Sequence, residues 1–240
     1  MDEILTSIKS LHLPGMAQQW TVLQETHQTE TLSLSDGMRL MLQAERDQRR
    51  EHRNARLVKN ARFRYEACLE QMAFDATRGL EKSRVLELAN CNFIKQGIPV
   101  IITGAAGTGK SWLATALGYQ ACMLGHSVLY YNMSKMIEEI ALARIQGAIT
   151  RFFEKLAKAE LLIIDDLGVK VLDGQQLLDF MEIMEDRHGR MATIIVSQLP
   201  VANWYDVMKS NTTAADAILD RIVHSATRFE LKGESMRRKK

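Results

Sequence analysis

The stretch VIITGAAGTGKS, residues 100–111, decides the fold of this 240-residue chain. An apolar, strand-like run leads into a segment that fits the P-loop pattern G-x-x-x-x-G-K-[ST] and opens a helical pattern. The segment reads Gly104-Ala105-Ala106-Gly107-Thr108-Gly109-Lys110-Ser111. Its glycines let backbone N–H groups turn towards phosphate oxygens, and the start of a helix adds a favourable dipole. An ordinary glycine-rich turn would not match all eight positions, so we expect all eight residues to bind a nucleotide.

The two residues that end this loop carry the most specific chemistry. Lys110 is expected to reach the β- and γ-phosphates of ATP, and the Ser111 hydroxyl is expected to bind Mg²⁺. The segment LLIIDD, residues 161–166, supplies the second half of such a site, because a buried strand exposes its last residues where ligands of open α/β sheets bind. We expect Asp165 to hold Mg²⁺, mostly through water, and Asp166 to orient or deprotonate the attacking water. Two solvated acids at a strand end are the alternative.

The rest of the chain from residue 99 alternates short apolar runs with helical patterns. We expect strands at 100–103, 127–132, 161–165, 192–197 and 227–231, and helices near 110–124, 133–147, 150–158, 174–188 and 213–224. Such alternation is typical of a parallel sheet covered by helices on both faces. The predicted fold class is therefore α/β, with a five-stranded parallel sheet flanked by helices.

The first 60 or so residues lack strand signals and read as helical. One stripe of apolar residues ends at Pro14-Gly15, a second follows it, and Ser33 or Ser35 can cap a third helix that reaches about Asn60. We therefore divide the chain into a small all-helical domain at 1–64 that binds DNA or a partner, a connector at 65–98, and an ATPase domain at 99–240.

Composition limits the class of protein and its compartment. The chain is 46% hydrophobic and 25% charged, within the range of globular proteins that form a core without disulfides or metals. Its three cysteines, Cys68, Cys91 and Cys122, form neither a disulfide framework nor a zinc ribbon. The sequence shows no secretory signal and no apolar stretch of about 20 residues, so we expect a cytoplasmic protein without a membrane partner.

Positive charge is concentrated in two places, although the net charge is only +2. Residues 46–64 carry eight basic and two acidic side chains, and residues 232–240 carry five basic and one acidic. Six basic residues recur at helical spacing and predict a stripe that neutralises DNA phosphates without reading sequence. They are Arg46, Arg49, Arg50, Arg53, Arg56 and Lys59, with Arg62 and Arg64 just beyond. A solvated helix face is the alternative, and Glu45, Asp47 and Glu51 offset part of the charge.

Five segments together resemble one family. These are 104–111, 161–168, the block SQLP at 197–200 followed by Trp204, DAILDRIVH at 216–224 and LKGESMR at 231–237. They are similar to IstB, the ATP-binding helper protein of IS21-type insertion sequences, which is related within AAA+ to the DnaC and DnaI helicase loaders. The resemblance covers nearly the whole chain and implies an AAA+ ATPase that assembles on double-stranded DNA as a ring or helix of identical subunits and assists a transposase.

The resemblance also implies further site residues. In AAA+ sheets the strand that ends near residue 198 lies between the P-loop strand and the Asp165 strand, so Gln198, or else Ser197, can act as sensor 1. Arg221 matches the arginine finger that a neighbouring subunit supplies, and Arg237 stands where a sensor 2 arginine is expected. Each role has a rival: Gln198 could only cap its strand, Arg221 could pair with Asp216 or Asp220, and Arg237 could belong to a phosphate-binding tail.

Two departures from the AAA+ pattern bear on activity. The second acid is usually Glu, and Asp166 is one methylene shorter, so hydrolysis is expected to be slow or dependent on a partner. The helical lid that normally carries sensor 2 has no matching segment near Arg237, so we expect an ATPase domain without a full C-terminal lid.

Alternative functions remain open on the sequence alone. A helicase loader is the nearest, because it shares the AAA+ class. A metabolite kinase would need an arginine-bearing lid and an acceptor pocket, for which the sequence gives no sign. A non-catalytic scaffold that ATP cements together stays compatible with Asp166.

Overall fold

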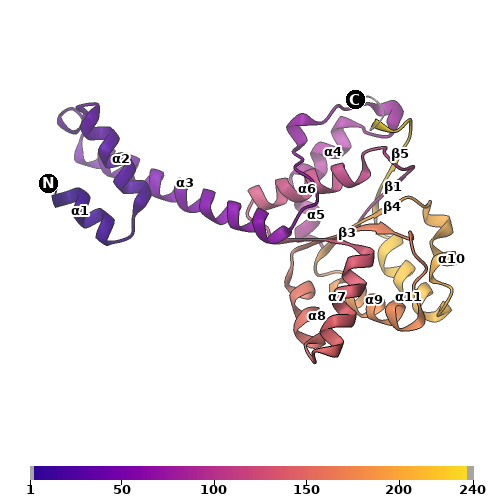
Figure 1. Cartoon of the computed structure of the whole chain (residues 1–240). Coiled ribbons are helices and arrows are strands. Elements are labelled where there is room, and N and C mark those ends of the chain that lie inside the picture. Colours follow the sequence, from indigo (N-terminus) through magenta and orange to yellow (C-terminus); the bar gives the residue numbers. More distant parts are fainter. Residues whose placement is uncertain (1–2, 237–240) are drawn as a thin grey trace. The chain divides into compact units, whose positions relative to one another are not determined.

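The computed structural model describes residues 3–236, which divide into two compact units between Arg56 and Leu57. Across this described range, no helix has the length and apolar character needed to cross a bilayer. Figure 1 shows the order of the elements along the chain.

The first unit is a helical bundle built around a small core. It contains α1 (Glu3–Ser10), α2 (Pro14–Glu25), a 3-10 turn at Gln28–Glu30 and the first part of α3 (Leu34–Ala61). Its buried apolar side chains are Ile8, Met16, Ala17, Leu23 and Met41. The Ser33 hydroxyl accepts a hydrogen bond from the Asp36 backbone N–H at 3.1 Å, which confirms Ser33 as the cap of α3.

The buried carboxylate of Glu45, on α3, caps the start of α2, although the two lie far apart in the sequence. Oε2 of Glu45 accepts hydrogen bonds from the backbone N–H groups of Gly15 at 2.8 Å and Met16 at 3.2 Å, both in the first turn of α2. Gly15 is needed here, because a Cβ at that position would lie 2.6 Å from the carbonyl oxygen of Ala44. The negative charge also complements the positive end of the helix dipole.

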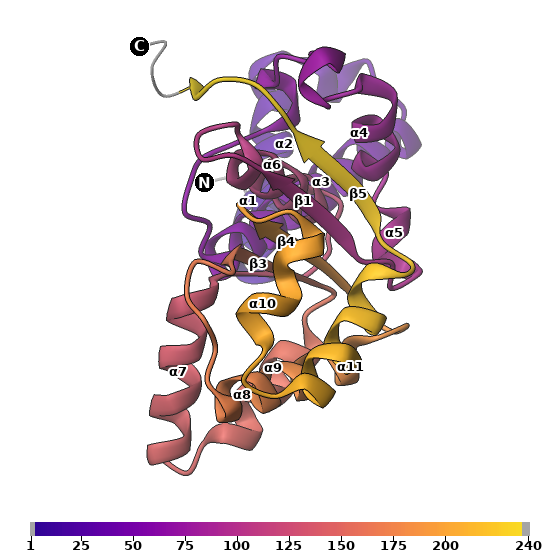
Figure 2. The ribbon, with the colours of Figure 1, turned by 90° about the vertical axis from the view of Figure 1, so that its right-hand side faces the viewer.

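The second unit is built on a parallel sheet with the strand order β2-β3-β4-β1-β5. Figure 2 shows β3, β4, β1 and β5 in this order. The strands are β1 (Val100–Gly104), β2 (Val128–Asn132), β3 (Leu161–Leu167), β4 (Ala192–Ser197) and β5 (Thr227–Leu231). All five match the predicted strands, and β4 lies between β1 and β3 as the AAA+ pattern implies. The carboxyl ends of β1, β3 and β4 therefore meet at one edge of the sheet.

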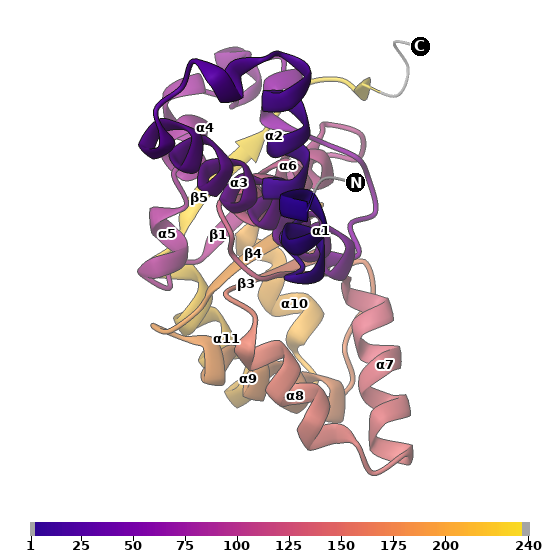
Figure 3. The ribbon, with the colours of Figure 1, turned by 90° about the vertical axis from the view of Figure 1, so that its left-hand side faces the viewer.

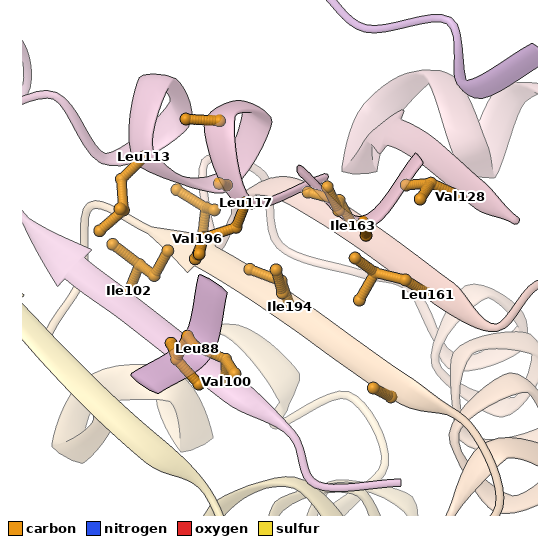
Figure 4. Packing of buried hydrophobic residues seen from close by; sticks show 14 of the residues in the cluster. Leu88, Val100, Ile102, Leu113, Leu117, Val128, Leu161, Ile163, Ile194 and Val196 are labelled. Atoms are coloured by element: carbon orange, nitrogen blue, oxygen red, sulfur yellow. The ribbon is translucent and has the colours of Figure 1, made fainter. Parts of the chain in front are cut away.

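Helices cover both faces of this sheet, which explains why its central strands are apolar throughout. One face, shown in Figure 4, packs strand residues such as Ile102, Ile163 and Ile194 against Leu113 and Leu117 of α6. The helices that supply this face are α4 (Lys82–Ala89), α5 (Asn92–Lys95) and α6 (Lys110–Met123). Leu57, Val58 and Ala61, at the end of α3, also join this core.

The opposite face is covered by five helices (Figure 3). They are α7 (Met133–Ile145), α8 (Ile149–Lys158), α9 (Gly174–Arg187), α10 (Trp204–Met208) and α11 (Thr212–Val223). The sequence did not predict α10, which is only five residues long and follows the 3-10 turn Val201–Asn203. Trp204 is fully buried and anchors this short helix to the core.

The segment that we predicted as a connector, 65–98, contributes to the core of the second unit. It contains α4, α5 and two 3-10 turns, Leu69–Gln71 and Ala76–Arg78. Its side chains Leu80, Val85, Leu88, Phe93 and Ile94 are buried against α6 and the sheet.

Candidate functional site

The P-loop runs from the end of β1 into the first turn of α6. Gly109 precedes α6 in the left-handed region at φ 97°, and Lys110 begins the helix. Lys110 is buried, and its Nζ donates a hydrogen bond to the carbonyl oxygen of Ala105 at 2.7 Å. The Thr108 hydroxyl donates to the same oxygen at 2.9 Å. These bonds close residues 104–111 into a compact loop whose backbone can surround a phosphate.

Asp165 is fully buried in β3, which β4 separates from the P-loop strand β1. Its Oδ1 accepts hydrogen bonds from the Ser111 hydroxyl at 3.1 Å and from the Asp166 backbone N–H at 2.8 Å, and its Oδ2 accepts one from the Tyr130 hydroxyl. Burial raises the pKa of Asp165, and the hydrogen bonds from Tyr130 and Ser111 oppose that rise. Burial also raises the pKa of Tyr130, which keeps its proton and donates a hydrogen bond to the carboxylate.

The donor set at Asp165 fits Mg²⁺. The carboxylate and the Ser111 hydroxyl are hard oxygen ligands, and a buried carboxylate with a raised pKa is a place where a cation would be favourable. Among the described residues there is no cluster of three or more His, Cys, Asp or Glu side chains that could hold a metal without help. An ion held here would thus need water and phosphate oxygens to complete its coordination, as Mg²⁺ does in nucleotide sites.

Asp166 follows Asp165 with an unusual backbone, in the left-handed region at φ 62°. Its Oδ2 accepts a hydrogen bond from the Asn132 side-chain amide at 2.8 Å and lies 3.5 Å from Nη1 of Arg64. Asn132 ends β2 directly beside Asp165, and its Oδ1 also caps α7 through the Ser134 backbone N–H. Sequence reasoning missed Asn132; the polar residue at the end of an apolar run was the signal that could have identified it.

The two sensor 1 candidates lie at the same edge of the sheet. Ser197 is buried at the end of β4, where its hydroxyl donates to the Leu167 carbonyl at 2.7 Å and accepts from the Leu199 backbone N–H at 3.1 Å. Gln198 is exposed one residue beyond the strand, and its side chain has no hydrogen-bond partner among residues 3–236. Ser197 is therefore committed to the local turn, whereas Gln198 is available to a ligand.

The segment after β5 lies against the P-loop, a contact that the sequence did not predict. The Met236 backbone N–H donates to the Gly107 carbonyl at 2.9 Å. A Cβ on Gly107 would lie 2.1 Å from the Ser235 hydroxyl oxygen, so only glycine permits this approach. Arg237, the sensor 2 candidate, lies outside the described residues.

Arg221 lies near the amino-terminal ends of the strands, at the end of the sheet opposite the P-loop. It belongs to the last turn of α11, beside a hollow lined by Gly97 and Pro99, which precede β1, and by Met191, which precedes β4. Its guanidinium donates to the Ala217 carbonyl at 2.9 Å and pairs with Glu185 of α9, also at 2.9 Å. The partner is thus neither Asp216 nor Asp220. The length of β1 separates Arg221 from the P-loop of its own chain.

The six residues of the predicted basic stripe all lie on α3, and all six are exposed. Arg49 pairs with Glu45 at 2.6 Å and Arg50 pairs with Asp47 at 2.6 Å. The other four form no ion pair with a described residue. Because a helix turns by about 100° per residue, Lys59 is rotated by roughly 140° from Arg46, so the stripe winds around the helix.

The strand order, the P-loop between β1 and α6, and the paired acids at the end of β3 define an AAA+ P-loop protein. A profile of the family described as IstB-like ATP binding protein matches residues 6–240. The chain belongs to this family, and it is therefore an ATP-binding protein of the AAA+ class.

Individual relatives agree with the family. A protein of Sinorhizobium fredii, named as an ATP-binding protein of an insertion sequence, is 39% identical over 234 residues, which are 98% of this chain and 95% of that one. The ATP-binding protein named for insertion sequence IS21 of Pseudomonas aeruginosa is 29% identical over 239 residues, covering 100% and 89% of the two chains. The crystal structure of the DnaC helicase loader covers 69% of this chain and 97% of that one, with a TM-score of 0.58 and 19% identity, a likeness of fold alone.

Proposed function

We propose that this protein is an ATP-dependent DNA-binding ATPase, stimulated by DNA, that assembles on double-stranded DNA and recruits or stimulates a transposase at the target site in DNA transposition. The observation that carries the proposal is the meeting of the P-loop, Asp165, Asp166 and Gln198 at one edge of the sheet in a chain of the IstB-like family. A helicase loader is the second candidate, but only a likeness of fold supports it.

Each residue at this edge has a role in the proposed hydrolysis. The backbone of residues 104–111 binds the phosphates, and Lys110 would release the Ala105 carbonyl to contact the β- and γ-phosphates. Ser111 and Asp165 would hold Mg²⁺, which neutralises charge on the phosphates when bound. Asp166 would orient or deprotonate the attacking water, and Gln198 would contact the γ-phosphate or that water.

Arg221 would complete the site of a neighbouring subunit. Its position at the opposite edge prevents it from reaching its own P-loop, whereas a head-to-tail contact between identical subunits would bring the two edges together. Such a contact repeats into a ring or a helix. To reach a phosphate, Arg221 would exchange its ion pair with Glu185 for the negative charge of the neighbour's nucleotide.

DNA binding is assigned to the basic stripe on α3. Exposed arginines on a long helix can neutralise several phosphates, and none of the six is buried in the fold. The contact would be with the backbone and would not select a sequence.

The test is ATP hydrolysis with and without long duplex DNA at low salt. We expect wild-type protein to hydrolyse ATP slowly and DNA to increase the rate. Lys110→Ala is the control: removal of a charge-assisted interaction worth about 1.5–3 kcal/mol should weaken ATP binding by roughly 10- to 150-fold. Equal rates with and without DNA in a preparation shown to bind DNA would contradict the proposal. Stimulation of strand transfer by the transposase of the same insertion sequence would separate it from the helicase-loader alternative.

A further inference from the structure

Arg64 forms an ion pair with Asp166, and the proposed hydrolysis gives it no role. Its Nη1 lies 3.5 Å from Oδ2 of Asp166. It belongs to the short segment, residues 62–65, that follows the last residue of α3. The contact therefore joins the end of the basic helix to the residue assigned to activate water.

Arg64 contacts a carboxylate oxygen of Asp166 that already accepts a hydrogen bond from another side chain. Oδ2 of Asp166 also accepts the hydrogen bond from Asn132 at 2.8 Å. A carboxylate oxygen that faces a guanidinium and an amide has fewer lone-pair directions left with which to contact the attacking water. The backbone of Asp166 has φ 62°, so contacts of the side chain and the neighbouring turn hold it in a conformation that L-residues rarely adopt.

The segment that carries Arg64 is anchored to the other acid as well. The ring of Phe63 packs edge-to-face on the ring of Tyr130, with centroids 6.3 Å apart and planes inclined by 71°. The Tyr130 hydroxyl donates to Asp165. Arg62, at φ 56°, ends α3 in the left-handed region and turns the chain towards these contacts. Consecutive residues 63 and 64 thus reach the two acids of the ATP site, one through Tyr130 and one directly.

The basic side chains of this segment are exposed to solvent and can therefore contact a polyanion such as DNA. The side chain of Arg64 is 52% exposed although it contacts Asp166, and Arg62 and Lys59 are exposed too. An arginine offers several donors in a planar fork that suits phosphate oxygens, so a DNA phosphate can compete for this guanidinium. An ion pair that is half exposed is weak enough to be exchanged.

We propose that Arg64 is a positioning residue that restrains Asp166 until DNA arrives. Without DNA, Arg64 holds Oδ2 of Asp166 away from the attacking water and ATP hydrolysis is slow. A DNA phosphate bound at the end of α3 takes the guanidinium, and Asp166 becomes free to act on the water. This mechanism rests on the proposed DNA-dependent ATPase and specifies how DNA reaches its catalytic acid.

The experiment compares ATP hydrolysis by wild-type protein, Arg64→Ala and Arg64→Lys, each without DNA and with saturating duplex DNA. Removal of a half-exposed ion pair should raise the DNA-free rate of Arg64→Ala by about two- to fivefold. The rate at saturating DNA should stay at the wild-type value, so the stimulation ratio falls by the same factor. Arg64→Lys keeps a cation in reach of Asp166 and should retain most of the restraint.

The control is Arg151→Ala, which removes an exposed arginine of α8 that has no described contact with Asp166. It should leave both rates unchanged. A DNA-free rate of folded Arg64→Ala at or below the wild-type rate would overturn the inference. If Arg64→Ala unfolds at the assay temperature, Arg64→Gln replaces it, because it removes the charge and keeps most of the side-chain length; a DNA-free rate of Arg64→Gln at or below the wild-type rate would overturn the inference. Absence of any DNA response in wild-type protein would instead contradict the proposed function.

Discussion

At the residue scale, the site contains a carboxylate, Asp165, whose negative charge is unfavourable because the side chain is buried. Asp165 is fully buried, and the hydrogen bonds from Tyr130, Ser111 and the Asp166 backbone offset only part of that cost, since its pKa remains above the usual range. A cation would complete the compensation. If Asp165 holds Mg²⁺ as proposed, this arrangement would exchange stability of the empty protein for affinity towards the metal.

Asp165→Asn should separate these two effects. The amide keeps the size of the side chain and removes the buried charge, so the thermal midpoint without nucleotide should rise or stay unchanged at pH 7. The affinity for ATP in Mg²⁺ should fall by roughly 10- to 150-fold, because the variant lacks an interaction of a charged group worth about 1.5–3 kcal/mol. Calorimetry of unfolding and nucleotide titrations with and without Mg²⁺ measure both. Wild-type affinity in Mg²⁺ would remove Asp165 from the metal site.

Asp166→Asn provides the comparison at the neighbouring position. It should bind ATP in Mg²⁺ with nearly wild-type affinity and fail to hydrolyse it, because an amide cannot accept a proton from water. Hydrolysis at the wild-type rate would show that another group activates the water.

At the scale of elements, α3 carries two different kinds of charge contact. Near its middle, Arg49 and Arg50 are held by acids one turn away on the same helix. Arg46, Arg53, Arg56 and Lys59 are exposed and pair with no described acid, so they are the residues of the stripe most available to phosphates. The structure therefore separates the stripe residues that are expected to contribute most to DNA binding from those already paired with an acid. Spacing in the sequence does not make this distinction.

Replacement of Arg46, Arg53 and Arg56 by Ala should flatten the dependence of duplex DNA binding on salt. The slope of log K against log[salt] should become less negative by roughly 0.9 for each phosphate that the variant no longer neutralises. A triple variant of exposed basic residues elsewhere, Arg151→Ala with Arg190→Ala and Lys209→Ala, removes the same charge and should retain the wild-type slope. Equal slopes for both triple variants would make the stripe a solvated face.

The first unit depends on the contact between α3 and the start of α2. Although burial alone would raise the pKa of Glu45, hydrogen bonds from Arg49 and from the backbone of Met16 and Gly15 lower it. A carboxyl with a lowered pKa contributes stability above its unfolded pKa of about 4.3, and this contribution is lost as the pH falls through the lower folded value.

Glu45→Gln should loosen the packing of α3 on α2 at neutral pH. A destabilisation of about 1 kcal/mol would increase amide hydrogen exchange of Gly15 and Met16 by roughly fivefold at pH 7. The difference from wild type should shrink as the pH is lowered below about 4, where Glu45 itself becomes protonated. Glu25→Gln, an exposed position on α2, is the matched control and should leave exchange unchanged. Equal protection in Glu45→Gln and wild type would show that the cap adds no stability.

At the scale of the whole molecule, the proposed catalytic residues of the second unit lie at opposite edges of one sheet. The P-loop and the two acids follow the carboxyl ends of the strands, and Arg221 lies beside residues that precede β1 and β4. One chain cannot bring these groups together while the sheet is intact. The arrangement is what an active site shared between subunits requires.

Mixing two inactive variants tests this sharing. Arg221→Ala should bind ATP through its own P-loop and fail to hydrolyse it, and Asp166→Asn should fail while still offering a normal Arg221 to its neighbour. In an equal mixture that assembles at random, roughly a quarter of the head-to-tail interfaces would combine both intact residues. ATP hydrolysis should therefore partly return, as measured by phosphate release. Continued inactivity of a mixture shown to co-assemble would count against a role in trans.

The sequence by itself determined the fold and predicts the nucleotide-binding segments, because both depend on local patterns. The P-loop fits one spacing in one context, and apolar runs that alternate with helical stripes allow few arrangements other than a parallel sheet covered on both faces. The predicted ends of β4 and β5 agree with the structure to the residue, since each strand ends where its apolar pattern ends.

Only the tertiary structure decided which distant residues meet. Asn132, Arg64 and Tyr130 reach the two acids from other strands and from the end of α3, and no local pattern marks such a meeting. Glu185, rather than an acid on the same helix, pairs with Arg221 for the same reason. Side-chain contacts depend on the register of the sheet and the packing of helices upon it, and these are set by the burial of the whole core at once.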